Sequence, residues 1–331
     1  MESKRIFLRT FNNKINSRSG AQLPLGQYRG TPEWLEFQKL LIECLEWLGH
    51  DVRIQVENPN IPDEDGFKLS DKYVYVHQNK KDNPKVDLTW MQMHHRDLFT
   101  IDTNGWGVEH SGLTYADSFM YENDYDSRDF CEKLSDEMHS SGVSKCKQDE
   151  ITDSTPDSFI LVPIQIPRDY TIQNYSPITV KYFIDSIQAW AIENRYHVCF
   201  KMHPHNSGDH DLHKAVDEAT VSRYVHKVKG NIHELIKRSV GLFVINSGTG
   251  FEGLIHGKPV ATLGLCDYSR ATFNADIRRL DEARTHLYSY RPEYRDIAYK
   301  FVHWYFFKHA YYLKDVNVKA RLTSYLKGVL C

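Results

Sequence analysis

Residues 243–253, FVINSGTGFEG, pass from an apolar stretch into a cluster of small and hydroxyl-bearing residues. Gly248 and Gly250 remove side chains where backbone amides could face an anion, and Ser247 and Thr249 offer hydroxyl donors. A helix beginning near Phe251 would point its positive end at the same place, which suits a phosphate. The segment matches neither the P-loop nor the G-x-G-x-x-G pattern, so a tight strand-to-helix turn is the alternative reading.

Residues 200–205, FKMHPH, close a second predicted strand. Proline holds the preceding residue extended, so Pro204 directs the His203 side chain reproducibly, and with Lys201 nearby we expect a rigid cation that suits a phosphate. The alternative is a metal site, although the spacing is neither that of H-E-x-x-H nor that of a zinc finger. Its ligands would come from His203, His205, Asp209, His210, Asp211 and His213.

Residues 161–170, LVPIQIPRDY, form a third apolar strand that ends near Gln165 and is followed by Asp169. A carboxylate in this turn could act as a nucleophile or a base, or could simply cap the loop. From these residues alone, the capping role of Asp169 is favoured.

The segments around the three motifs alternate between strand and helix patterns. This alternation is typical of an α/β domain with a parallel sheet, and ligands of such sheets bind at the carboxyl ends of the strands. We therefore expect the three motifs to meet at one edge. The predicted strands are 159–166, 197–202, 241–246 and 259–264, and the predicted helices are 178–194, 212–219, 232–237 and 251–256.

The first half of the chain also begins with a strand, a helix and a strand, the order of a βαβ unit. A polar, turn-rich stretch at 147–158 predicts a linker, so the chain is expected to form two doubly wound domains that face a cleft. The predicted elements are strands 5–10, 51–56, 72–77 and 97–102, a helix over 31–48, and C-terminal helices over 292–313 and 316–330. The expected domains are residues 1–150 and 158–290, followed by the helices of 291–331.

Composition sets limits on the function. The 331 residues carry a formal charge of −3, which gives no general reason to expect nucleic acid as a partner. The six cysteines are scattered, so neither a zinc ribbon nor a disulfide framework is indicated. There is no signal-peptide pattern and no apolar run long enough for a transmembrane helix, so we expect a cytoplasmic protein.

Taken together, these motifs resemble the bacterial capsule polysaccharide biosynthesis family, whose members include β-Kdo transferases that use a CMP-activated sugar. The resemblance covers chiefly residues 158–272. LVPIQIPRDYTI is similar to the family's strand that ends in Gln and is followed by Asp. The family's Lys-x-His-Pro and Asn-Ser-x-x-Gly-x-Glu motifs, the latter followed by Gly-Lys-Pro-Val, match Lys201, His203, Pro204, Asn246, Ser247, Gly250, Glu252 and residues 257–260. Gly248 departs from the Ser-Thr pair that usually follows the Asn.

This resemblance implies a GT-B architecture, with the nucleotide held by the C-terminal domain, the acceptor by the N-terminal domain, and last helices that cross back to the first domain. It implies that His203 and Ser247 contact the donor phosphate and nucleotide, that Asp169 is the carboxylate at the anomeric carbon of a retaining enzyme, and that Glu252 accepts from a ribose hydroxyl. No metal or other cofactor is then required. The implied donor-binding set is Gln165, Lys201, Pro204, Asn246, Ser247, Gly248, Thr249, Gly250 and Glu252.

The first half resembles the family less. DTNGWGVEHSGL, residues 102–113, follows a predicted strand and is similar to a family segment, so Asp102 or Glu109 would line the acceptor side. A closer literal match, EDGF at residues 64–67, falls in a predicted loop, and the copy at the strand end is preferred.

The function expected from the motifs and the resemblance is transfer of a sugar from a nucleotide donor, favoured as CMP-Kdo-like, to a glycan or glycolipid acceptor. Three alternatives stay open: a UDP- or GDP-sugar donor on the same fold, a non-catalytic protein that binds glycans or nucleotides, and a metal-dependent hydrolase built on residues 203–213. Peripheral association with a membrane is also left open.

Overall fold

The structure is a computed structural model that describes residues 4–10, 31–56, 72–76, 78–145, 148, 153–206 and 208–330. The chain forms two compact units: Met1–Tyr115 together with Phe306–Cys331, and Ala116–Tyr305. This division differs from the expected boundary at 147–158. The EDGF segment at residues 64–67 lies outside the described residues.

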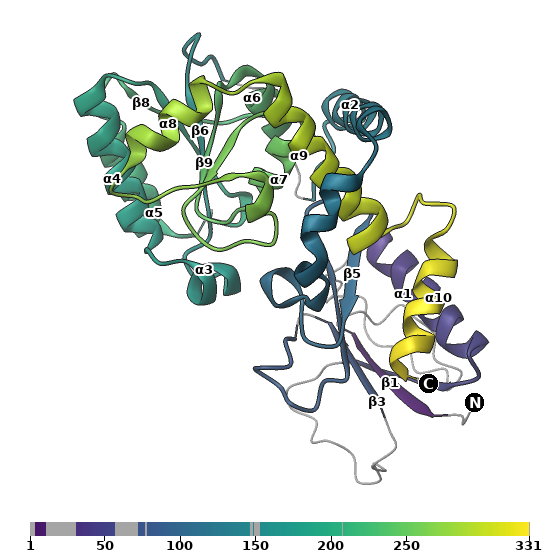
Figure 1. The fold of residues 1–331 in the computed structure, drawn as a ribbon. Coiled ribbons are helices and arrows are strands. Elements are labelled where there is room, and N and C mark those ends of the chain that lie inside the picture. Colours follow the sequence, from purple (N-terminus) through teal and green to yellow (C-terminus); the bar gives the residue numbers. More distant parts are fainter. Residues whose placement is uncertain are drawn as a thin grey trace. The chain divides into compact units, whose positions relative to one another are not determined.

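The first unit contains a six-stranded sheet in the order β12-β5-β4-β3-β1-β2 (Figure 1). Strands β1 to β4 pair in parallel, whereas β5 runs antiparallel to β4 and β12 runs antiparallel to β5. The last strand comes from the C-terminal part of the chain, so residues after 305 complete the first sheet. The strands are β1 (Arg5–Thr10), β2 (Asp51–Val56), β3 (Lys72–Val76), β4 (Leu88–Gln92), β5 (Leu98–Asp102) and β12 (Tyr311–Tyr312).

Two helices, α1 (Pro32–Trp47) and α10 (Val318–Leu330), lie side by side in this unit (Figure 1). Their apolar stripes enter one cluster with the inward-facing residues of the sheet, among them Phe37 of α1 and Leu322 of α10, both fully buried. The expected helix over 292–313 is shorter: α9 (Pro292–Trp304) ends in a π-helical turn at Tyr305–His309, and β12 follows.

The second unit is a doubly wound α/β domain whose six strands, in the order β11-β10-β9-β6-β7-β8, all pair in parallel. The strands are β6 (Ile160–Ile164), β7 (Val198–Met202), β8 (Val225–Val228), β9 (Gly241–Val244), β10 (Val260–Thr262) and β11 (Phe273–Asn274). The helices besides α9 are α2 (Asp124–Ser141), α3 (Tyr170–Tyr175), α4 (Val180–Asn194), α5 (His210–Ala219), α6 (Ile232–Arg238), α7 (Gly248–Ile255) and α8 (Leu280–Tyr288).

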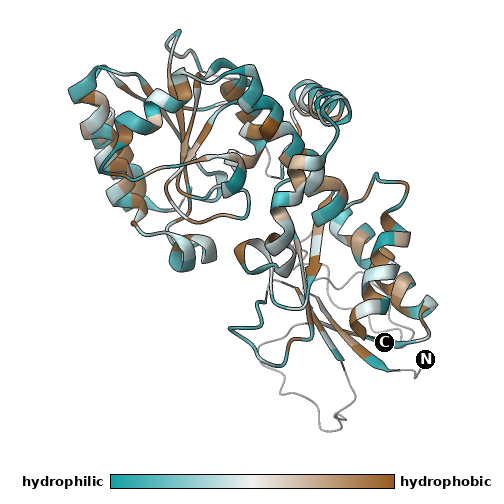
Figure 2. Ribbon diagram, viewed as in Figure 1, coloured by the Kyte–Doolittle hydropathy of each residue, from teal (hydrophilic) through white to brown (hydrophobic). Residues whose placement is uncertain are grey.

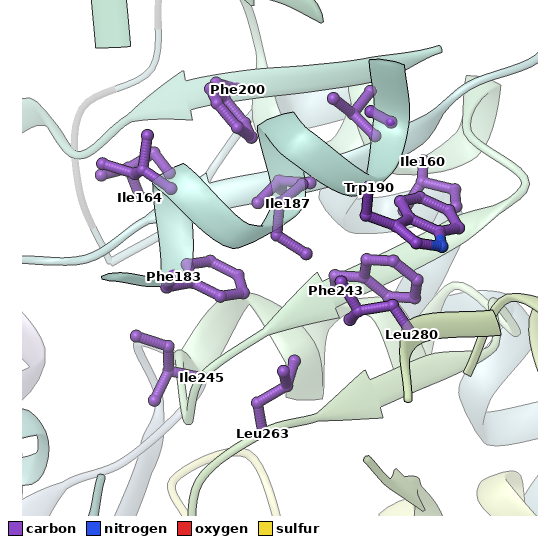
Figure 3. Packing of buried hydrophobic residues seen from close by; sticks show 14 of the residues in the cluster. Ile160, Ile164, Phe183, Ile187, Trp190, Phe200, Phe243, Ile245, Leu263 and Leu280 are labelled. Atoms are coloured by element: carbon purple, nitrogen blue, oxygen red, sulfur yellow. The ribbon is translucent and has the colours of Figure 1, made fainter. Parts of the chain in front are cut away.

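One face of this second sheet packs against α4, α5 and α8. Figure 3 shows Ile187 of α4 among Ile160, Phe200 and Phe243 of the sheet. Burying each of these large apolar side chains contributes about 1.5–3 kcal/mol relative to leaving it exposed. Figure 2 shows the matching pattern, in which the strands are largely hydrophobic and the helices carry hydrophilic turns. This core fixes the strand ends that carry the motifs.

Helix α2 was not expected, because its sequence DYDSRDFCEKLSDEMHSS is mostly polar. Only a narrow stripe is buried, including Cys131, Leu134 and Met138 at helical spacing. The Asn123 side chain accepts from the Asp126 amide and caps the helix start, and Gly142 ends it in the left-handed conformation. The helix packs against α9, which explains why the second unit begins before the expected linker.

The described part of the expected linker is bonded to the second unit. The Gln148 side chain accepts a hydrogen bond from the Ile232 amide, and the Asp153 carboxylate accepts one from the Lys229 amide. Among the described residues, no helix combines the length and the apolar character that crossing a membrane requires.

Candidate functional site

The carboxyl ends of β9, β6 and β7 are neighbours in the second sheet, so the three motifs share one edge. Two hydrogen bonds join Gln165 and Asn246. Gln165 Nε2 donates to Asn246 Oδ1 at 2.9 Å, and the backbone N–H of Asn246 donates to Gln165 Oε1 at 3.1 Å. Asn246 Nδ2 also donates to the carbonyl of Thr171 at 3.0 Å. Both side chains are buried, so they hold the strand ends and loops of the site in place.

A second amide side chain, which the sequence analysis did not single out, ties the end of β7 to that of β6. Asn206 is 2% exposed, and its Nδ2 donates to the carbonyls of Ile164 and Gln165 at 3.4 and 3.3 Å. It closes a 3-10 turn that begins at the exposed Pro204. The turn therefore presents His203 from a fixed backbone.

His203 is neutral at neutral pH. Its pKa is about 4 rather than 6.5, mainly because burial disfavours the charged ring and partly because of His205 and nearby lysines, while Asp169 acts in the opposite direction. Nδ1 accepts from the His205 amide at 3.1 Å, so the ring proton sits on Nε2. The expected fixed cation is thus replaced by an Nε2–H donor, and positive charge comes from Lys201 on β7, which is 7% exposed.

Asp169 caps α3. Its Oδ1 accepts from both the amide and the hydroxyl of Thr171, at 2.8 and 2.6 Å. Within the described residues Oδ2 accepts no hydrogen bond, and the carboxylate is close enough to His203 to act on its pKa. The capping role expected from the sequence is present, and the capping bonds use only Oδ1 of the carboxylate.

Helix α7 begins at Gly248, not near Phe251, because Ser247 caps it by accepting from the Thr249 amide at 3.2 Å. Gly248, Thr249 and Gly250 are therefore the first turn of the helix rather than a loop before it. Amides in a first helical turn lack partners within the helix and carry its positive dipole end. The sequence predicts a later start for this helix because glycines are poor helix formers and suggest a turn.

Tyr268, which belongs to none of the three motifs, supports this turn. Its hydroxyl donates to the Ser247 carbonyl, and a Cβ placed on Gly250 would lie 2.5 Å from that hydroxyl. The absence of a side chain at Gly250 is thus required by the protein's own tyrosine. Gly253 has a similar use, since a Cβ there would lie 3.0 Å from Val260 where α7 packs on the sheet.

Glu252 lies in α7 and is 5% exposed. Its Oε1 accepts from the hydroxyl of Ser144 at 2.6 Å. Ser144 lies just before the predicted linker at 147–158 and far from the motif in the sequence, so spacing alone could not reveal its contact with Glu252. The contact shows that the segment after α2 borders the site.

Behind the site, two buried histidines link three helices. His233 Nε2 donates to the Val143 carbonyl at 2.9 Å, so its Nδ1 must accept from His256 Nε2, at 3.0 Å. His256 Nδ1 then accepts from the Ser135 hydroxyl at 2.7 Å. These bonds assign one neutral tautomer to each ring and fasten α2 to α6 and to the end of α7.

This network predicts an acid-sensitive fold. Burial, reinforced by His233, lowers the pKa of His256 from 6.5 to about 3. Between these pH values the unfolded chain binds a proton that the folded protein does not, so the free energy of unfolding should fall on acidification by up to about 1.4 kcal/mol per pH unit. The free energy of unfolding, measured by urea denaturation at several pH values in this range, should depend less steeply on pH in His256→Gln than in the wild type. The exposed control His210→Gln should show the wild-type pH dependence. Equal slopes for all three proteins would contradict this assignment.

The proposed acceptor-side residues lie in the first unit. Asp102 is 1% exposed and accepts hydrogen bonds from the amides of Asn104, Gly105 and Ser111 and from the Ser111 hydroxyl, so it organises the loop after β5. Glu109 is part-exposed and pairs with Lys81 at 2.7 Å.

The metal site considered for residues 203–213 depends on how their histidines lie. His213 Nε2 bonds to the Asn206 carbonyl at 3.1 Å, and His205 is exposed. In the part of the chain that the structure describes, no group of three or more His, Cys, Asp or Glu side chains is arranged to hold a metal ion.

Comparisons with known proteins place this geometry in a family. Residues 122–325 match the sequence model described as capsule polysaccharide biosynthesis protein. The KpsC β-Kdo 2,7 transferase of Thermosulfurimonas dismutans is similar in structure, with a TM-score of 0.54 at 13% identity over 99% of each chain. The KpsC β-Kdo 2,4 transferase of the same organism gives 0.49 at 16% identity, over 89% of this chain and 96% of that one. No curated protein sequence matches the chain.

The family match spans more than half of the chain, and the structural match spans nearly all of it. Two sheets rich in parallel strands, each with its own core, agree with the expected α/β fold of two Rossmann-like domains. The chain belongs to the capsule polysaccharide biosynthesis family and has the GT-B fold of a glycosyltransferase.

Proposed function

We propose that the protein transfers a sugar from a nucleotide donor, favoured as a CMP-linked, Kdo-like sugar, to a glycan or glycolipid acceptor with retention of configuration. The observation that carries the proposal is the single edge of the second sheet where the His203 Nε2–H, the first turn of α7 and Asp169 come together. The printed activity of the similar KpsC structure, β-Kdo transfer, favours this donor class.

In this proposal the donor phosphate lies between His203 and α7. The neutral imidazole donates its Nε2 proton to a phosphate oxygen, and the hydroxyls of Ser247 and Thr249 and the backbone amide of Gly248 add further donors. Such preorganised donors stabilise charge that develops on a leaving phosphate, so no metal ion is required for this step. Glu252 accepts a hydrogen bond from a ribose hydroxyl. Lys201 supplies positive charge to the site, whose shape is set by Gln165, Pro204, Asn246 and Gly250.

Asp169 acts on the sugar. Its Oδ2 attacks the anomeric carbon, the bond from that carbon to the phosphate oxygen breaks, and the nucleotide leaves with the bonding electrons. The acceptor hydroxyl then attacks the same carbon, the bond to Asp169 breaks, and a base takes the hydroxyl proton. Two inversions give retention. On the acceptor side, Glu109 is the more exposed candidate, and Asp102 shapes its loop.

A thermal-shift screen with CMP, UDP and GDP tests the donor class. A nucleotide held at about 100 times its Kd should add about 2.7 kcal/mol of stability and raise the melting temperature by several degrees. We expect CMP to give the largest shift. A larger shift with UDP or GDP would move the assignment to that donor, and binding of CMP with no sugar transfer to any capsule-type acceptor would favour a non-catalytic binding protein.

A further inference from the structure

The chain leaves α2 along a path that is fixed at two successive residues. Helix α2 ends at Gly142, whose φ of 63° turns the chain sharply. The next carbonyl, of Val143, accepts from His233 Nε2 at 2.9 Å, and the Ser144 hydroxyl donates to Glu252 at 2.6 Å. Residues 143 and 144 are therefore fastened to α6 and α7, beside the candidate site.

Lys145 follows immediately and is exposed. Because its neighbour Ser144 contacts Glu252, the Lys145 backbone lies at the border of the site. Its charge also contributes to lowering the pKa of His203, which places the ammonium within electrostatic reach of that imidazole. Residues 144 and 145 therefore interact with two groups of the site: Ser144 with the carboxylate assigned to the ribose, and Lys145, through its charge, with the imidazole assigned to the phosphate.

A cation at this place would add to the positive charge of Lys201 and would offset the charge of two carboxylates. His203 is neutral, and the carboxylates of Asp169 and Glu252 would repel an anionic donor. In a nucleoside 5′-monophosphate the ribose hydroxyls and the phosphate are separated by a single sugar ring, so two adjacent residues can serve both groups. An ammonium is also a strong, charge-assisted donor to phosphate.

We propose that Lys145 binds the phosphate of the nucleotide donor, and that Ser144 is the positioning residue that holds both Lys145 and the Glu252 carboxylate in place. This inference rests on the proposed function and adds two residues to its site. Both come from outside the three strand-end motifs.

Calorimetric titration of the full chain with CMP and with cytidine tests the phosphate contact. Lys145→Ala should weaken CMP binding by about 10-fold or more and leave cytidine binding unchanged, because only CMP carries the phosphate. Lys145→Arg should retain most of the affinity, and Lys181→Ala, which removes an exposed lysine of α4, should match the wild type. Equal CMP affinity in Lys145→Ala and wild type would overturn the inference alone, as would an equal loss for cytidine.

A wild-type protein that binds no nucleotide would overturn the inference and the proposed function together. A second measurement needs no ligand: removing the Lys145 charge should raise the pKa of His203 above about 4, as followed by imidazole chemical shifts. An unchanged pKa would contradict the placement of Lys145. Ser144→Ala should reproduce part of the CMP defect, and normal CMP binding by that variant would remove its positioning role.

Discussion

Asp169→Asn is expected to lower the rate of sugar transfer by about 10³-fold or more while nucleotide binding survives. Asparagine caps helices as well as aspartate does, so the bonds from Thr171 to the Oδ1 position should persist and α3 should stay formed. What is lost is the anionic Oδ2, the atom assigned to the anomeric carbon. Groups that act directly on the reacting atoms are commonly worth factors of about 10²–10⁴ or more.

The matched control is Asp209→Asn. Asp209 caps α5 in the same way, by accepting from the Leu212 amide at 3.0 Å. This variant should transfer sugar at close to the wild-type rate. If Asp169→Asn were equally active, Asp169 would be only a helix cap, and the retaining double displacement would have to be abandoned.

Gly250→Ala is expected to destabilise the second unit and to disturb the first turn of α7. The added Cβ would lie 2.5 Å from the Tyr268 hydroxyl and 3.0 Å from its ring, and both residues are buried. Overpacking of this kind typically costs about 1–3 kcal/mol. The clash should also shift Ser247, whose carbonyl Tyr268 holds, so nucleotide affinity and melting temperature should fall together.

Tyr268→Phe provides the complementary change. Alone it removes the hydrogen bond to the Ser247 carbonyl, but combined with Gly250→Ala it removes the closest contact, so the double variant should be more stable than the two single losses predict. Gly328→Ala in α10, where a Cβ meets nothing within 4 Å, should be neutral or slightly stabilising. If the losses of stability in Gly250→Ala and Tyr268→Phe simply added up in the double variant, the clash would have to be relieved by other residues.

The strands and helices that carry the motifs could be predicted from the sequence because each is a continuous apolar run or a regular stripe. Residues 160–164, 198–202 and 241–244 lie within the expected strands, and the α/β class is confirmed by the observed sheets. The elements that escaped prediction include strands β4 and β8 and helices α2 and α8. β8 buries only its end residues, and α2 buries a narrow stripe inside a strongly polar sequence.

The site could be predicted only as far as the motif residues themselves. The start of α7 was placed too late, because the helix is set by the Ser247 cap while its glycines suggest a loop. The charge of His203 depends on burial and on Lys145 and His205, which no spacing reveals. Ser144 and Tyr268 reach the site from distant parts of the chain, so only the folded structure shows their contacts with Glu252 and Ser247.

In the proposed function, the edge formed by β6, β7 and β9 of the second unit binds a nucleotide through its phosphate. The most direct measurement is the CMP-induced rise in melting temperature of the wild type and of His203→Ala, each compared with its own unliganded protein. We expect a rise of several degrees for the wild type and little or none for the variant. An equal rise in both proteins, or none in the wild type with any nucleotide, would contradict it.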